Sequence, residues 1–179
     1  MDAVLSEVVS AAPAAGSFPW LSLIVLLPSA AALLMPLLPG DGDDPRLPRS
    51  VALITLAADF ALMLWVFARH FDGGSSSLQL VERFTWVPAL GLEWSLGADG
   101  LSAPLVVLSG LVTLLSAAAS WNVARKTRLY FALLLVQASA QALVFLSQDF
   151  LLFFLAWELE LVPVYLLIAI WGGPQRQYA

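Results

Sequence analysis

Long apolar runs separated by short polar breaks are the dominant pattern along this chain of 179 residues. A helix needs about 20 largely apolar residues to cross the hydrocarbon core of a bilayer. Five runs reach that length, and the breaks between them are rich in proline, glycine, serine and charged residues. The pattern predicts an all-α integral membrane protein with five transmembrane helices, over residues 19–38, 50–69, 100–121, 129–147 and 149–171.

The segments outside these helices complete the predicted organisation. Residues 1–18 predict a tail rather than a signal peptide, because they carry two acidic and no basic residues and lack a sustained apolar core. In the loop over residues 70–99, LQLVERFTWV and LGLEWSL alternate between apolar and polar positions on either side of Pro88. Such alternation predicts a small hairpin on the membrane surface. Residues 172–179 begin a further loop.

The basic residues predict how the helices are oriented. With the N-terminus outside, the inner side holds six of them and the outer side two, and cytoplasmic loops are normally the ones enriched in Lys and Arg. We therefore expect residues 70–99 on the outer or lumenal side and residues 172–179 on the cytoplasmic side. The inner set is Arg46, Arg49, Arg125, Lys126, Arg128 and Arg176, and the outer set is Arg69 and Arg83.

Composition agrees with the membrane assignment and narrows the chemistry. Hydrophobic residues make up 60% of the chain and charged residues 12%, where soluble domains carry about 25% charged residues. The mean hydropathy is +0.87. A formal net charge of -5 argues against a nucleic-acid partner, and the lack of cysteine excludes disulfides and thiolate-held iron–sulfur clusters within the chain. No dinucleotide fingerprint, phosphate loop or Cys/His metal cluster is present, so we expect no cofactor and no metal bound by this chain.

Two glutamates interrupt the fifth apolar run, in the stretch WELELVP over residues 157–163. An ionisable side chain at the bilayer centre costs about 2.5–3.5 kcal/mol on insertion scales, and such residues usually serve function. Glu158 and Glu160 are two positions apart, so on a regular helix they face roughly opposite sides. We expect Glu158 to act as a proton relay and treat Glu160 as a candidate second carboxylate. The alternative is that a glutamate only satisfies a neighbour's hydrogen bond.

Asp59, near the centre of the second helix, is a further candidate. It either takes part directly in a proton path or is a hydrogen-bonded structural residue at a helix or subunit contact. Gln137 and Gln141 are four positions apart and share one face of the fourth helix. Their amides either join neighbouring helices or hold water in a proton wire.

Several stretches resemble a known family. The run DFLLFFLAWELELVPVYLLIAIWGG closely resembles the fifth transmembrane helix of the antiporter-like membrane subunits of complex I. More narrowly, it resembles the chain 4 (NdhD) family of the NAD(P)H–plastoquinone oxidoreductases of cyanobacteria and chloroplasts. FPWLSLIVLLPSAAALL, LQLVERFTWVP and WSLGADGLSAPLVVLSG agree in the same order.

The resemblance implies a larger protein of about fourteen helices, built from two inverted five-helix repeats. Each repeat has a broken helix with a lysine, and the fifth-helix glutamate pairs with the lysine of the first repeat. That glutamate corresponds to Glu158, whereas a glutamate at the position of Glu160 is typical of the photosynthetic branch. The only lysine here, Lys126, lies in a predicted loop. We therefore expect this sequence to be the N-terminal portion of such a subunit.

The implied function is proton translocation coupled to electron transfer to a quinone. NAD(P)H or reduced ferredoxin, plastoquinone and iron–sulfur clusters are expected elsewhere in the complex. The expected partners are other membrane-arm subunits and the lipid bilayer, in a cyanobacterial membrane or the chloroplast thylakoid. One alternative is a subunit of a multi-subunit cation/proton antiporter. Another is a truncated structural membrane subunit without its own proton path. Some paralogues serve CO2 uptake, and the sequence leaves that choice open.

Overall fold

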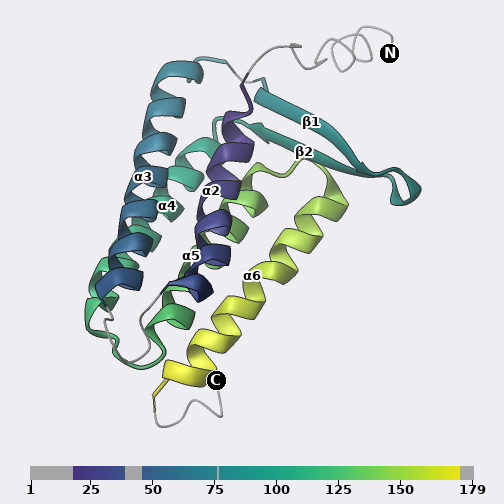
Figure 1. Cartoon of the computed structure of the whole chain (residues 1–179). Helices are drawn as coiled ribbons and strands as arrows, with labels where there is room; N and C mark the ends of the chain where they lie inside the picture. Colours follow the sequence, from purple (N-terminus) through teal and green to yellow (C-terminus); the bar gives the residue numbers. More distant parts are fainter. Residues whose placement is uncertain (1–17, 39–45, 76, 174–179) are drawn as a thin grey trace, which may run out of the picture.

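Five α-helices form the body of the molecule in a computed structural model that describes residues 18–38, 46–75 and 77–173 (Figure 1). Each helix, with its 3-10 extension where present, is long and apolar enough to cross a membrane, which confirms the predicted all-α membrane class. The 3-10 turns follow α2 over Met35–Leu37 and α4 over Ser120–Asn122. The helices are α2 Trp20–Leu34, α3 Arg46–His70, α4 Ser102–Ala119, α5 Thr127–Leu146 and α6 Phe150–Trp171.

The second helix begins earlier than the sequence pattern predicted. We expected it over residues 50–69, but α3 starts at Arg46 and includes Pro48 in its first turn. Proline is tolerated there because the first N–H groups of a helix have no intrahelical acceptor. Reading the proline as a helix breaker therefore placed the boundary one turn too late. The rest of the predicted loop before α3, residues 39–45, lies outside the described part of the chain, as do residues 1–17 and 174–179.

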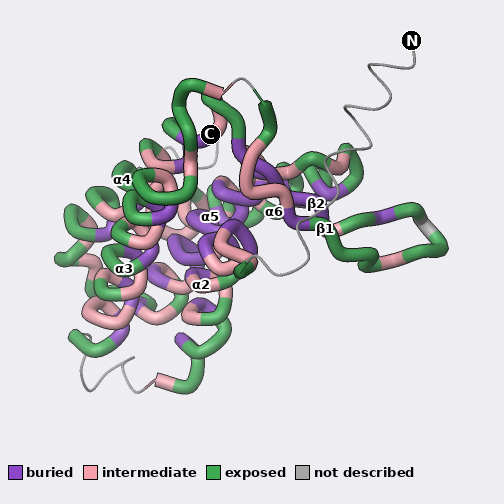
Figure 2. Tube along the Cα trace, turned by 90° about the horizontal axis from the view of Figure 1, so that it is seen from above, coloured by how far each residue is buried: buried purple, intermediate pink, exposed green. Residues whose placement is uncertain are grey.

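A two-stranded antiparallel hairpin lies between α3 and α4, where the alternating pattern predicted one. Strand β1 covers Gln79–Val87 and β2 covers Leu92–Ala98, and the hairpin projects sideways from one end of the bundle (Figures 1 and 2). The connection from α5 to α6 extends this small sheet, because the backbone N–H of Gln148 donates to the carbonyl of Ser95 (2.8 Å). The hairpin is thereby fixed to the start of α6.

Glu82 of β1 fixes the hairpin to the start of α2. Its carboxylate accepts hydrogen bonds from the backbone N–H groups of Leu21 (2.7 Å) and Ser22 (2.9 Å). Ser22 Oγ also donates to it and in turn accepts from Trp94 Nε1 (2.8 Å). These backbone donors are the unpaired N–H groups of a helix N-terminus, which favours negative charge. Glu82 therefore caps α2 across about 60 residues of sequence.

Acidic side chains also begin the later helices. Asp99 Oδ1 accepts from the backbone N–H groups of Leu101 and Ser102 at the start of α4. Hydrogen bonds from Ser102 and then Leu101 hold the pKa of Asp99 below its ordinary value. Asp149 accepts from the N–H of Leu152 (2.8 Å) and so is the residue that caps α6. Ser147, two residues earlier, donates its hydroxyl to the carbonyl of Leu143 on α5.

Helix α5 lies at the centre of the bundle and contacts the other four helices. Seen from above, the buried segments gather around α5 and the exposed ones lie on the outer helices (Figure 2). The apolar core forms two clusters. The hairpin-side cluster includes Leu21, Ile24, Val25, Met63, Val66, Val106, Leu143, Leu146, Leu152 and Ala156. The far-side cluster includes Ala32, Met35, Ala52, Leu56, Ala117, Phe131, Leu134, Leu135 and Ala138.

Aromatic groups mark both ends of the bundle. Trp20, Trp65 and His70 contact one another at the hairpin end, with ring centroids 4.9–5.5 Å apart. At the opposite end, Trp171 Nε1 donates to the carbonyl of Arg125 (2.9 Å), and the Trp121 ring lies near the Arg49 guanidinium. Aromatic side chains at two opposite ends of apolar helices are typical of the two membrane–water interfaces.

Candidate functional site: a polar layer across the bundle

Polar side chains separate the two apolar clusters. On α3 the buried stripe runs from Ala52 and Leu56 of the far-side cluster to Met63 and Val66 of the hairpin-side cluster, with Asp59 between them. The same interruption recurs on α4, α5 and α6. We call this set of residues the polar layer: Asp59, Thr113, Gln137, Ser139, Gln141 and Glu160.

The polar layer lies at mid-membrane depth. Asp59, Gln137 and Glu160 are each within about one residue of the middle of their own helices. With a rise of about 1.5 Å per residue, each lies some ten residues, or about 15 Å, from either helix end. Polar groups at that depth are costly unless they pair with one another or line a pathway. The layer is therefore the leading candidate for a functional site in the described residues.

Glu160 is the carboxylate through which α6 joins this layer. Its Oε1 accepts from Gln137 Nε2 (3.0 Å) and from Gln141 Nε2 (3.3 Å) on α5. The spacing of four residues puts both amides on one face of α5, as the sequence indicated, so a single carboxylate oxygen reaches both. The amides therefore join two helices. The alternative role, holding water in a proton wire, stays a prediction.

The layer continues from α5 to α4 through a residue that the sequence analysis missed. Thr113 is buried, and its Oγ1 lies 3.4 Å from Gln141 Oε1 and 2.9 Å from the carbonyl oxygen of Ser109 on its own helix. Gln141 thus has Glu160 on one side and Thr113 on the other. One signal in the sequence could have pointed to Thr113: it lies seven residues after Val106 and four before Ala117, on the stripe that α4 buries.

Asp59 is the most deeply buried carboxylate in the layer, with 2% of its surface exposed. Within the described residues its Oδ1 has no hydrogen-bond partner. The arginines of α3 and α5 lie near the ends of these helices, so in the described helices no basic side chain lies at the depth of Asp59. The structure thus places Asp59 inside the bundle and not on its outer surface.

The Glu158 side chain points away from the polar layer. It is exposed on the outer face of α6, whereas Glu160 is partly buried against α5. The two carboxylates lie on different sides of α6, as the spacing of two residues predicts. Around Glu158 the outer face is strongly apolar, with Trp157, Leu161 and Val162 each about half exposed. Among the described residues the structure therefore connects Glu160 to the bundle and leaves Glu158 facing outward.

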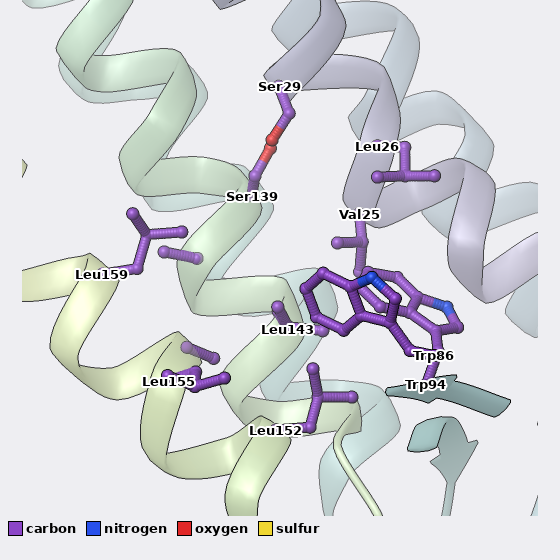
Figure 3. Close-up of a pocket in the computed structure, with 12 residues that line it drawn as sticks. Val25, Leu26, Ser29, Trp86, Trp94, Ser139, Leu143, Leu152, Leu155 and Leu159 are labelled. Carbon is purple, nitrogen blue, oxygen red and sulfur yellow. The ribbon is translucent and has the colours of Figure 1, made fainter. Parts of the chain in front are cut away.

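A cavity of about 230 Å³ adjoins the layer between α2, α5, α6 and the hairpin (Figure 3). Its walls are mainly apolar, and Trp86 and Trp94 line the hairpin end. Ser29 of α2 and Ser139 of α5 point toward one another at the opposite end. Ser139 is buried and its hydroxyl has no hydrogen-bond partner among the described residues. No group of three or more His, Cys, Asp or Glu suited to a metal occurs in the part of the chain that the structure describes.

Comparison with known proteins identifies relatives over nearly the whole chain. NAD(P)H-quinone oxidoreductase chain 4 1 of a Synechococcus species is 60% identical over 162 residues, or 90% of this chain. Its counterpart in Synechococcus elongatus is 57% identical, and that in a Nostoc species 52% identical, over the same length. The chain is homologous to NAD(P)H-quinone oxidoreductase chain 4. It spans about 30% of the length of these chain 4 relatives. No family model matches the sequence.

Solved structures support the same fold. Residues covering 88% of the chain superpose on 30% of a chain in respiratory complex I from Thermus thermophilus with bound NADH, with a TM-score of 0.71 and 26% identity. The chain also shares its fold with part of the Mrp complex from a Dietzia species, with a TM-score of 0.66, 24% identity and coverage of 86% of this chain and 16% of that one. The five-helix arrangement is thus that of complex I and Mrp membrane subunits.

Proposed function

We propose that this chain forms part of a proton-translocating subunit in the membrane arm of an NAD(P)H-quinone oxidoreductase. The observation that carries the proposal is a pair of carboxylates in the middle of a membrane helix, in a chain 52–60% identical to chain 4 of that enzyme. Electron transfer to a quinone would drive proton movement through this subunit. Ionisable residues at this depth commonly mark proton relays in pumps and transporters.

The two carboxylates have different roles in this proposal. Glu160 is held by α5 and connects to the interior of the bundle. Glu158 faces outward at mid-membrane depth, where contact with hydrocarbon would be unfavourable. We therefore expect further protein to cover the outer face of α6 and to bring a cation toward Glu158. The lysine of a broken helix, implied by the family resemblance, has the required charge. Glu158 would then exchange a proton each time that pairing changes.

The remaining components follow from the proposed enzyme. NAD(P)H or reduced ferredoxin would supply electrons, and plastoquinone and iron–sulfur clusters would be bound by other subunits. The partners would be neighbouring membrane-arm subunits and lipid. The names of the cyanobacterial relatives support a cyanobacterial membrane, and the family resemblance adds the chloroplast thylakoid as a second location.

Substitution of Glu158 tests the proposal. In the full-length protein within its assembled complex, Glu158→Gln keeps the size of the side chain but cannot carry a proton as a carboxyl group does. We expect quinone-reductase turnover in sealed vesicles to acidify the lumen at least about tenfold more slowly, because a relay group is lost. Glu93→Gln is the matched control, since it removes the same charge from the exposed face of the hairpin. Wild-type pumping by an assembled Glu158→Gln complex would contradict the proposal and favour a structural role.

The second candidate is the alternative that the sequence analysis left open, a subunit of a cation/proton antiporter. The likeness to the Mrp complex, at 24% identity, shows the shared fold alone. The same vesicles distinguish the two functions. An oxidoreductase subunit requires an electron donor and a quinone for proton movement. An antiporter subunit would move protons in response to a Na⁺ or K⁺ gradient without either.

A further inference from the structure

Unsatisfied polar atoms gather in the polar layer. The structure leaves four buried side-chain atoms without a partner among the described residues, and three of them belong to Asp59, Gln137 and Ser139. Each of these side chains is more than nine-tenths buried. Buried polar atoms are nearly always hydrogen-bonded, and where protein groups do not suffice, ordered water supplies the bond. The layer therefore has the composition of a water-binding site in an otherwise apolar core.

The register of α3 against α4 brings Asp59 to the level of Thr113. These two helices run in opposite directions and are close together at Gly110, where an added Cβ would lie 2.6 Å from Met63 Sδ. Asp59 precedes Met63 by one turn, and Thr113 follows Gly110 by one turn. In antiparallel helices both steps lead in the same direction along the bundle. Asp59 and Thr113 therefore lie at one depth, on the buried sides of adjacent helices.

From Thr113 the contacts continue to α6. Thr113 Oγ1 is 3.4 Å from Gln141 Oε1, and the Gln141 amide group donates to Glu160. Gln137 donates to the same carboxylate, and its own Oε1 is buried without a partner. Helix α3 also contacts α5 directly. Hydrogen bonds thus connect Thr113, Gln141, Gln137 and Glu160 across three helices, and Asp59 lies at the depth of Thr113 on the fourth.

We propose that Asp59 and Glu160 exchange a proton through water bound in the polar layer, with Thr113, Gln137 and Gln141 holding that water. In each transfer the carboxylic acid at one end loses a proton and the carboxylate at the other end gains it. No other reactant is needed. This inference rests on the proposed function above and adds a pumping role for Glu160, the candidate second carboxylate. The new element is that Asp59 accepts and releases the proton at the α3 side of the bundle. The proton moves between α6 and α3 roughly parallel to the membrane plane.

The test uses the full-length protein in its assembled complex, in sealed vesicles, with protons moved per electron as the readout. We expect Asp59→Asn to lower that ratio at least about tenfold, because a proton station is lost. Thr113→Val removes the hydroxyl at nearly constant volume and should lower the ratio as well. Ser116→Ala is its control, since Ser116 is exposed on α4 and its hydroxyl donates to the carbonyl of Val112 on the same helix.

A double variant tests the connection itself. The effects of two substitutions in one relay are not additive. The double variant Asp59→Asn with Glu160→Gln should therefore move as many protons per electron as whichever single variant moves fewer. A wild-type ratio in Asp59→Asn, with a lowered ratio in Glu160→Gln, would overturn this inference and leave the proposed function intact. Wild-type ratios in both Asp59→Asn and Glu160→Gln, with a lowered ratio in Glu158→Gln, would likewise overturn only this inference. A wild-type ratio in an assembled Glu158→Gln complex would contradict the proposed function itself. Should Asp59→Asn fail to assemble, Thr113→Val decides: a ratio equal to that of Ser116→Ala overturns the inference.

Discussion

Two buried carboxylates in this molecule have opposite environments. Glu82 of the hairpin is 8% exposed and accepts three hydrogen bonds from the start of α2. Asp59 of α3 is 2% exposed, and its Oδ1 has no partner among the described residues. The first arrangement satisfies the charge fully and ties two segments together. The second leaves capacity for a proton or a water molecule. The difference separates a carboxylate that stabilises the fold from one that is available for transport.

The largest expected effect is at Glu82. Glu82→Ala leaves two backbone N–H groups and the Ser22 hydroxyl without their acceptor and removes the α2 cap. We expect a loss of about 3 kcal/mol in the free energy of unfolding, from denaturant titration of the full-length subunit in mixed micelles. Glu93→Ala, exposed on the same hairpin, should change little. Protons moved per electron should stay normal in the Glu82→Ala complexes that assemble. A selective loss of pumping in Glu82→Ala would contradict the assignment of Glu82 to the fold rather than to transport.

The next effect is at the two amides that hold Glu160. Gln137→Leu removes the shorter bond (3.0 Å) and Gln141→Leu the longer one (3.3 Å). Interhelical hydrogen bonds in membranes contribute about 0.6–1.7 kcal/mol, so we expect Gln137→Leu to cost about 1 kcal/mol and Gln141→Leu less. The same micelle titration measures both. Equal stability of the two variants and the wild type would show that the amides are not helix-joining groups.

A smaller, pH-dependent effect is expected at Asp99. Its pKa is lowered by hydrogen bonds from Ser102 and Leu101, so the ionised form is favoured in the folded protein. That stability is present above the ordinary Asp pKa of about 3.9 and is lost as pH falls through the lowered value. Because the side chain is exposed and its charge is screened by solvent, we expect ionised Asp99 to contribute about 0.5 kcal/mol to the free energy of unfolding. Asp99→Asn should lack this acid-side step in a pH series of unfolding midpoints. An unchanged step in Asp99→Asn would assign it to another group.

The smallest effect on stability is expected at Asp59. Replacing a buried polar group that lacks partners by an apolar one of similar size is often neutral or stabilising. Asp59→Leu should therefore leave the free energy of unfolding nearly unchanged. A loss as large as that of Glu82→Ala would show that Asp59 is a structural residue like Glu82.

The sequence was sufficient for the helices because their length and apolar character are local properties. Pro48 misplaced the start of α3, since a proline that breaks a helix interior is accepted in its first turn. The opposite orientations of Glu158 and Glu160 also followed from local spacing. Gln137 and Gln141 were predictable as a pair on one face, but not their shared partner, which lies on another helix.

The polar layer itself could not be predicted, because it depends on how four helices align in depth. Asp59 and Thr113 come to one level only through the close approach of Met63 and Gly110. Glu82 gave no local signal either, because the N–H groups that it caps lie about 60 residues away. Patterns within a helix indicate which side chains are buried, whereas long-range packing decides which of them meet.

The most direct test of the central claim is the number of protons moved per electron by an assembled complex that carries Glu160→Gln. Glu160 is the one layer carboxylate with side-chain donors from another helix among the described residues, so its substitution interrupts the polar layer where the contacts define it. The account predicts a ratio at least about tenfold below that of the wild type while quinone reduction continues. A wild-type ratio would contradict the claim that the polar layer carries protons.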